Sequence, residues 1–266
     1  MPSPGDNLYT RLVRPLLFRL DPETAHRLTI AALSLMPRLR PDDDPPQLAT
    51  TVFGLPFANP VGLAAGMDKD ARALDGWNAL GFGFAELGTI TPRPQPGNAP
   101  PRMWRLASQR ALINRLGFPG EGMEAAAMRL RRARYGPLGK VANGSDHALR
   151  VGLNFGPNKD TPPEQVAEDY AALTHRLAPS ASFIVVNLSS PNTPGLRKWQ
   201  APERMRAIVE AVRAVLPADE DRPPILVKIA PDLEPEQLSA VCAAAMDLVG
   251  SKGSDVIGIV ATNTTL

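Results

Sequence analysis

The sequence predicts an α/β protein, a (β/α) barrel of which about six strand–helix units are present. Short apolar runs recur along the chain, helical segments lie between them, and a cluster of small polar residues follows each run. Continuously apolar strands that alternate with helices are typical of a parallel sheet buried on both faces. Six such units favour a barrel, although periodicity alone leaves an open sheet as the alternative.

Composition excludes several classes of protein. The chain has 266 residues, of which 44% are hydrophobic, enough for one large domain or two small ones. Its 29 basic and 27 acidic residues nearly balance, unlike those of a nucleic-acid-binding protein. The single cysteine, Cys242, rules out a disulfide framework and fits a reducing compartment. No apolar run approaches the ~18 residues of a membrane span, no signal peptide is recognisable, and the histidines show no metal-ligand spacing.

Residues 1–40 predict a pair of amphipathic helices. Leucines recur every four residues, at Leu8, Leu12, Leu16 and Leu20, and the sequence after Asp21 restarts a helix with an N-cap and a proline. Arginines outnumber acids in this segment, so one interpretation is a helical pair on an anionic membrane surface. The other is a helical hairpin packed on its own domain. A proline- and aspartate-rich linker, 41–46, separates this segment from a second unit, residues 46–266.

The second unit contains the predicted strands and the polar clusters that follow them. The strands are expected at 61–65, 84–87, 151–153, 183–186, 225–227 and 257–261. Helices are expected to begin near 161, where Thr161 and Glu164 have the spacing of a capping box, and near 234. In a barrel, all the polar clusters would lie at the carboxyl-end face, where active sites are built.

Neutral amides are unusually frequent in these clusters. The candidates are Asn154, Asn187, Asn192 and Asn263, accompanied by Lys69 and Lys228 at strand ends. An asparagine amide both accepts and donates, so several around one point match a ring with alternating C=O and N–H groups, such as a pyrimidine dione. A lysine matches a carboxylate or the negative charge of a reduced flavin. The alternative is that the asparagines cap turns and the lysines are solvated.

The motifs of the chain resemble those of class 2 dihydroorotate dehydrogenases, the membrane-associated, quinone-dependent branch of that family. The matching segments are NPVGLAAGMDKD (59–70), LGTITPRPQPGNAPPR (87–102), LINRLGF (112–118), NLSSPNTPGLR (187–197), VKIAPDL (227–233) and ATNTTL (261–266). The resemblance implies an FMN-containing barrel that oxidises dihydroorotate to orotate in pyrimidine biosynthesis and passes the electrons to a membrane quinone.

The resemblance also implies site residues. FMN is expected on Ala65, Gly66, Lys69, Thr89, Asn154, Asn187, Lys228 and Thr262. Substrate contacts are expected from Lys69, Asn114, Arg115, Leu116, Gly117, Phe118, Asn187, Asn192, Asn263 and Thr264. Ser190 takes the place of the catalytic base, with Thr193 as its nearest relay. Class 1 relatives carry cysteine at the position of Ser190, so class 2 is favoured.

In class 2 relatives the N-terminal helices form an apolar mouth through which quinone enters from the membrane. His26 and Arg105 match positions that line this tunnel. The resemblance therefore implies a peripheral protein on the cytoplasmic side of the inner membrane, acting as a monomer, with no nucleic-acid partner and no metal.

The chain departs from the family at its end. A (β/α)8 TIM barrel needs eight strands, and about six precede Leu266, so the barrel is expected to be incomplete at the C-terminus. Relatives continue with roughly two more units that carry the loops for the FMN phosphate. We therefore expect a piece of a longer chain. The alternatives are a catalytically incompetent remnant that keeps its membrane association, or a soluble class 1 flavin barrel.

Overall fold

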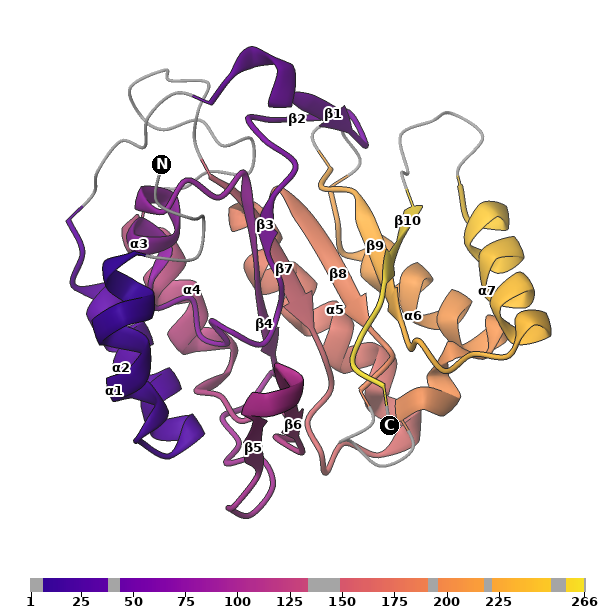
Figure 1. The fold of residues 1–266 in the computed structure, drawn as a ribbon. Coiled ribbons are helices and arrows are strands. Elements are labelled where there is room, and N and C mark those ends of the chain that lie inside the picture. The colour runs from indigo at the N-terminus through magenta and orange to yellow at the C-terminus, as the bar shows by residue number, and fades with distance from the viewer. Residues whose placement is uncertain are drawn as a thin grey trace.

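A six-stranded parallel sheet forms the body of the molecule (Figure 1). The computed structural model describes residues 7–37, 44–133, 149–190, 196–217, 222–249 and 257–265. In spatial order the strands are β10 (Ile257–Ala261), β9 (Ile225–Ile229), β8 (Phe183–Asn187), β7 (Arg150–Phe155), β4 (Phe84–Ile90) and β3 (Gly62–Leu63). All six predicted runs form strands, and the sheet curls into a partial (β/α) barrel. The predicted fold class is confirmed.

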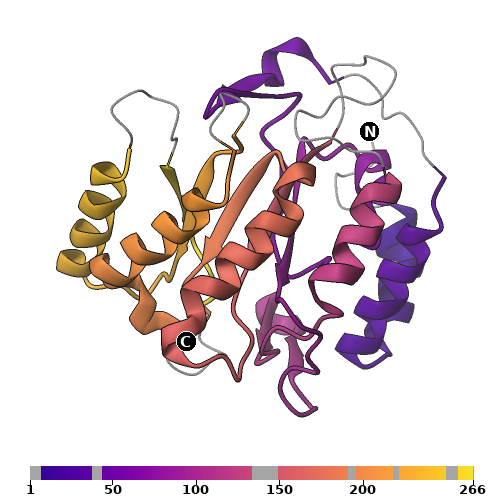
Figure 2. The same cartoon turned by 180° about the vertical axis from the view of Figure 1, so that it is seen from behind.

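Strands β7, β8 and β9 are buried at every position because both faces of the sheet are covered. Side chains such as Leu87, Leu153 and Val186 pack outward against the helices in one large core. The covering helices are visible in Figure 2: α4 (Gly122–Ala133), α5 (Val166–Leu177), α6 (Pro202–Ala214) and α7 (Pro235–Asp247). A shorter helix, α3 (Leu74–Ala79), precedes β4.

One helix start was predicted correctly and one was not. At α7 the capping box is complete, since Glu234 and Gln237 each bond the backbone of the other. Near 161 no capping box forms, because the Thr161 hydroxyl instead donates to Asp169 over 2.5 Å. A 3₁₀ turn, Pro163–Gln165, intervenes, and α5 begins later than expected. Other 3₁₀ turns are Pro46–Leu48, Ala107–Gln109, Ala178–Ser180 and Leu196–Gln200.

The N-terminal segment contains a π-helical turn (Tyr9–Val13), α1 (Arg14–Phe18) and α2 (Pro22–Ser34). Asp21 caps α2 as predicted, accepting from the Thr24 amide over 2.9 Å. Helix α2 packs against α3 and the strand β5 (Met103–Leu106), whereas no residue of α1 or of the π-helical turn is buried. The packed-hairpin interpretation therefore holds for α2, and the membrane interpretation of the remaining N-terminal turns stays a prediction. Among the described residues, no helix has the length and apolarity needed to cross a bilayer.

Two small antiparallel pairs were not predicted. Strand β1 (Thr50–Val52) pairs with β2 (Leu55–Phe57), and β5 pairs with β6 (Ala111–Asn114). Their side chains are largely exposed, so they lack the continuous apolar pattern that identifies the central strands. The second pair extends beyond the carboxyl ends of the central strands and forms one wall of the site described below (Figure 1).

Aromatic rings line the inner face of the curled sheet. Phe84 packs edge-on against Phe57 and Phe183, with ring centroids 5.7 and 6.0 Å apart, around the buried Leu55, Val185 and Leu226. Gly152 on β7 makes room for the ring of Phe183, because a Cβ atom there would lie 2.1 Å from it. Together these aromatic rings border a cavity of about 470 Å³ on the inner face of the sheet.

We expect Gly152→Ala to destabilise the protein by about 1–3 kcal/mol, because the added methyl group overpacks against Phe183. Chemical denaturation measures the change. Phe183→Leu supplies the matched test, since a smaller side chain relieves the clash. The double variant should lose less stability than the sum of the single variants. Strictly additive losses would show that the two side chains do not compete for the same space.

Candidate active site

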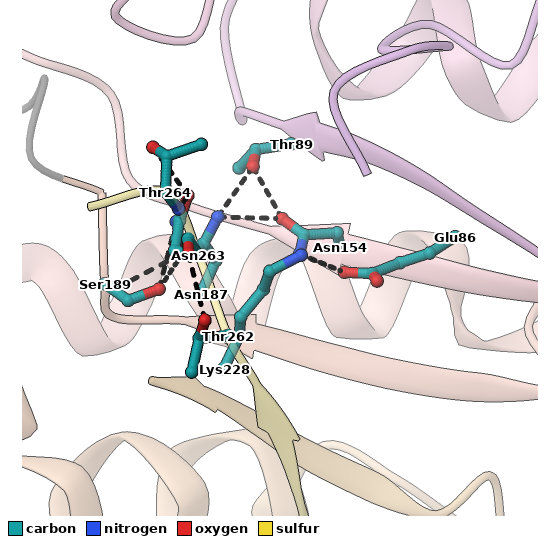
Figure 3. A network of polar contacts seen from close by, with 9 residues as sticks. All are labelled: Glu86, Thr89, Asn154, Asn187, Ser189, Lys228, Thr262, Asn263 and Thr264. Carbon is teal, nitrogen blue, oxygen red and sulfur yellow. Dashed lines mark hydrogen bonds and ion pairs between the residues drawn. The ribbon is translucent and has the colours of Figure 1, made fainter. Parts of the chain in front are cut away.

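The carboxyl ends of four adjacent strands bring polar side chains to one place. Thr89, Asn154, Asn187 and Lys228 come from β4, β7, β8 and β9, and Asn187 pairs in register with Lys228 (Figure 3). Because the strands are parallel, their ends lie at the same edge of the sheet. All four residues are buried. The convergence expected for these residues is therefore present.

Hydrogen bonds join these side chains into a chain of amides. The Thr89 hydroxyl donates to Asn154 Oδ1 over 2.6 Å. Asn187 Nδ2 donates to the same oxygen over 3.2 Å and to the Thr89 hydroxyl over 2.9 Å. On the far side of Asn187, its Oδ1 accepts from the Ser189 hydroxyl and from Asn263 Nδ2, over 3.1 and 3.3 Å. The amides are thus held in fixed orientations and do not simply cap turns.

A buried ion pair lies beneath the amides. Lys228 Nζ is 3.3 Å from Glu86 Oε1, and both side chains are under 10% exposed. Glu86 also accepts from Asn154 Nδ2 over 2.6 Å. Sequence reasoning missed Glu86, because it was counted within an apolar run. The sequence does contain a signal for it: a single acid lies between Ala85 and Leu87 in a strand expected to be buried. Because a buried charge requires a partner, such an acid points to a buried polar site.

Lys69 lies on the loop after β3, and its ammonium donates to the Gly66 carbonyl oxygen over 2.6 Å. Burial lowers the pKa of Lys69, and the nearby negative charge of Asp70 opposes that change. The loop itself is anchored by Asp68, whose carboxylate accepts from the backbone of Arg72 and from the indole of Trp77. Asp68 is a structural residue that the sequence analysis did not single out.

His26 connects α2 to this loop. Its Nε2 lies 2.6 Å from the Met67 carbonyl oxygen, and because a carbonyl can only accept, Nε2 carries the proton. Burial is the main cause of a lowered pKa at His26, and the positive charge of Lys69 adds to it. Arg105 makes a second link, donating from Nη1 to the Leu20 carbonyl oxygen over 2.8 Å and lying over the ring of Phe18.

A single cavity of about 710 Å³ collects most of the nominated residues. Those that line it are His26, Ala65, Gly66, Lys69, Thr89, Arg105, Asn114, Leu116, Gly117, Phe118, Asn187, Ser190, Lys228, Asn263 and Thr264. Its volume is in the range of small-molecule sites. A second cavity of about 420 Å³ adjoins it and shares His26, Met67 and Lys69.

Three of the nominated residues that the structure describes do not line this cavity. Asn154 is fully buried under the cavity and reaches it only through Thr89 and Asn187. Thr262 lines the interior of the sheet instead, and its hydroxyl donates to the Asn263 carbonyl oxygen. Arg115 is exposed and donates to the Pro101 carbonyl oxygen, so its side chain does not join the cavity. Asn192, like the proposed relay Thr193, lies outside the described residues.

The chemistry of the cavity suits a flat heterocycle. Its inner end presents neutral amides and ammonium groups, and Ser190 is only 4% exposed beside them. Gly66 has a φ of +105°, and a Cβ atom added there would meet nothing within 4 Å, so its backbone borders open space. The outer end is apolar, with Leu17, Phe18 and Leu112. Among the described residues, no group of three or more His, Cys, Asp or Glu side chains could hold a metal ion.

Comparison with known proteins gives consistent matches. A family model described as dihydroorotate dehydrogenase matches residues 47–266. A "dihydroorotate dehydrogenase (quinone)" of Acidithiobacillus ferrooxidans is 48% identical over 269 residues, covering 96% of this chain and 70% of that protein. The protein of the same name from Mycobacterium tuberculosis is 48% identical over 265 residues, covering 96% of this chain and 68% of the relative. This chain therefore spans about 70% of the length of such relatives.

A solved structure supports the same assignment of fold. The dihydroorotate dehydrogenase of Eimeria tenella, crystallised in complex with ferulenol, superposes with a TM-score of 0.80 at 35% identity. The match covers 94% of this chain and 70% of the other. The ligand-free form from the same organism gives the same TM-score at 36% identity.

The position of His26 predicts a pH-dependent stability. Its pKa is lower in the folded state, so the unfolded chain binds more protons near pH 6, and stability should fall as the pH drops through the ordinary pKa of 6.5. We expect His26→Gln to weaken this dependence, by at most about 1.4 kcal/mol per pH unit for a single proton. Urea unfolding between pH 5 and 8 measures it.

The exposed His175 on α5 provides the control for this experiment. His175→Gln should leave the pH dependence of the unfolding free energy as it is in the wild type. If both variants shift the curve equally, burial of His26 is not its source.

Proposed function

The chain belongs to the dihydroorotate dehydrogenase family, and we propose that its 710 Å³ cavity holds FMN and dihydroorotate side by side. The reaction is the oxidation of dihydroorotate to orotate with a quinone as the electron acceptor. FMN, when bound, would supply the redox chemistry that accepts electrons from the substrate and passes them on to quinone. The observation that carries this proposal is that Lys69, Asn114, Asn187, Ser190 and Lys228 all line one cavity.

The residues present fit an isoalloxazine ring. The open backbone at Gly66 allows a planar group to approach closely, as does that of Ala65. Thr89, Asn187 and Lys228 line the inner end of the cavity, where Lys228 is the group with protons left to donate. Its ammonium would stabilise the negative charge that develops when a flavin is reduced. Asn154 supports Asn187 from below, and Thr262 supports Asn263.

Dihydroorotate is a pyrimidine dione that carries a carboxylate, and the cavity offers a partner for each of these groups. The Lys69 ammonium suits the carboxylate, and its partial desolvation strengthens that interaction. The ring amides suit Asn114, whose side-chain amide both donates and accepts, and Asn187 and Asn263 border the same cavity. The backbone from Leu116 to Phe118 closes the site on the side of β6.

Ser190 is proposed as the base that accepts the proton from C5 of dihydroorotate. A serine hydroxyl is a weak base in water, so the role requires a dry site and a route for its own proton. Ser190 meets the first requirement with 4% exposure. Ser189 and Asn263 form a hydrogen-bonded pair beside it, with 3.0 Å between Asn263 Nδ2 and the Ser189 hydroxyl oxygen.

Quinone is proposed to enter at the outer end of the cavity. Leu17, Phe18 and Pro22 from the N-terminal segment face Met103 and Leu112 from the β5–β6 pair across this opening. The same two segments carry exposed apolar side chains, which form the rim of this proposal: Leu8, Leu12 and Leu16 in the N-terminal segment and Leu112 and Ile113 in β6. Such an apolar rim favours contact with a lipid surface. On this proposal the chain is a monomeric, peripheral protein on the cytoplasmic side of the inner membrane.

We expect Ser190→Ala to retain yellow, bound FMN and to slow its reduction by dihydroorotate by a factor of at least about 10². Anaerobic stopped-flow absorbance at the flavin band measures the rate of reduction. Ser239→Ala provides a control, because the Ser239 hydroxyl caps the Pro235 carbonyl on α7, away from the cavity. An unchanged rate in Ser190→Ala would remove Ser190 from the role of base.

The apolar rim gives a separate prediction. Leu12 and Leu16 are 59% and 61% exposed, and burying each in lipid contributes about 1.5–3 kcal/mol. The double variant Leu12→Glu/Leu16→Glu should therefore bind anionic vesicles at least tenfold more weakly and lose quinone turnover, while dihydroorotate still reduces its flavin. Vesicle co-sedimentation and a quinone-coupled assay measure these effects.

Met246→Glu is the matched control for this variant, since Met246 is 75% exposed on α7, outside the rim. Equal loss of vesicle binding in the control and in the double variant would mean that lipid contact is not localised to the N-terminal segment.

A further inference from the structure

Glu86 is a buried carboxylate that the reaction proposed above does not use. It lies on the inner face of β4, is 5% exposed, and borders the apolar interior next to Phe84, Phe183 and Leu226. A carboxylate in such surroundings costs free energy even when it is paired, and apolar side chains often serve stability better there. Its presence therefore calls for a role other than packing.

The first consequence of Glu86 is that it fixes which atoms donate and which accept along the chain of amides (Figure 3). A carboxylate can only accept hydrogen bonds, so the 2.6 Å contact fixes Nδ2 of Asn154 toward Glu86 and Oδ1 toward Thr89 and Asn187. Asn187 must then donate to Asn154, which turns its own Oδ1 toward Ser189 and Asn263. A neutral glutamine at position 86 could donate as well as accept, and Asn154 would no longer be held in one orientation.

The second consequence concerns charge. Glu86 lies 3.3 Å from the ammonium of Lys228, which borders both the cavity and the interior. The pair is neutral overall, so a neutral oxidised ring can bind without facing an isolated buried cation. When negative charge develops in the cavity, Lys228 attracts it and Glu86 repels it. The carboxylate therefore opposes the addition of electrons, and Lys228 favours it.

We propose that Glu86 is a positioning residue that sets the direction of the Asn154–Asn187–Asn263 chain and moderates the charge of Lys228, and so controls how readily bound FMN accepts electrons. This inference rests on the proposed FMN site. Glu86 itself does not line the cavity; it acts through Asn154 and Lys228.

The test is the midpoint potential of bound FMN in Glu86→Gln, measured by anaerobic redox titration of the purified holoprotein. Removing a buried negative charge favours reduction, so the potential should become more positive. We expect the equilibrium constant for two-electron reduction to rise at least tenfold, which corresponds to about 30 mV. Titration of the apoprotein with oxidised FMN should show a smaller change in affinity, because the oxidised ring is neutral.

Glu124→Gln is the control, since it makes the same chemical change on an exposed side chain of α4 that pairs with Arg176. Its potential should equal that of the wild type. A role of Glu86 in folding alone would lower thermal stability or FMN occupancy without moving the potential, and that result overturns the inference. A wild-type protein that binds no FMN would overturn the proposed function itself, which distinguishes the two failures.

Glu86→Asp covers the case in which the glutamine variant does not fold. The shorter side chain keeps its charge but withdraws from the 2.6 Å contact with Asn154 and from Lys228. The midpoint potential should again become more positive. The equilibrium constant for two-electron reduction should rise at least twofold. An unchanged potential in Glu86→Asp would also refute the inference.

Discussion

Parallel pairing of the central strands is the constraint on which the rest of the structure depends. Because the six strands of the central sheet all run in the same direction, the residues that follow each strand meet at one edge, although they are up to about 200 positions apart in sequence. Alternation along each strand then sorts the side chains. In β8, Ile184 and Val186 pack under the helices, while Val185 and Asn187 face inward. The alternation of side chains along β8 thus places the Asn187 amide on the cavity side.

The interior of the sheet is layered by polarity. Rings of phenylalanine line its lower part, and above them Glu86, Asn154 and Lys228 form a buried polar layer. The side chains of the polar layer are buried, so hydrogen bonds and charges act more strongly there than at the surface. A site arranged in this way orients its amides before a ligand arrives, and a ligand then need not reorganise them. The cost is the desolvation of one ion pair, which is offset by geometry that satisfies both partners.

Much of this arrangement follows from sequence patterns. The six apolar runs predicted the six strands, because a strand buried on both faces has no other pattern available, and the amides at 154, 187 and 263 were expected to converge for the same reason. The two antiparallel pairs were missed because exposed strands carry no continuous apolar signal. Glu86 was missed because a single acid within a strand does not interrupt the apolar pattern of the residues around it. Arg115 and Thr262 could not be placed from sequence, since adjacent residues of a loop or strand end point in different directions.

The hydrogen bond between His26 and the Met67 carbonyl has one more consequence. It joins α2, which follows the π-helical turn and α1, to the loop that carries Lys69, only two residues beyond Met67. A displacement of α2 is therefore transmitted to that loop and to its ammonium. The N-terminal segment and the inner end of the cavity are thus mechanically coupled by a hydrogen bond.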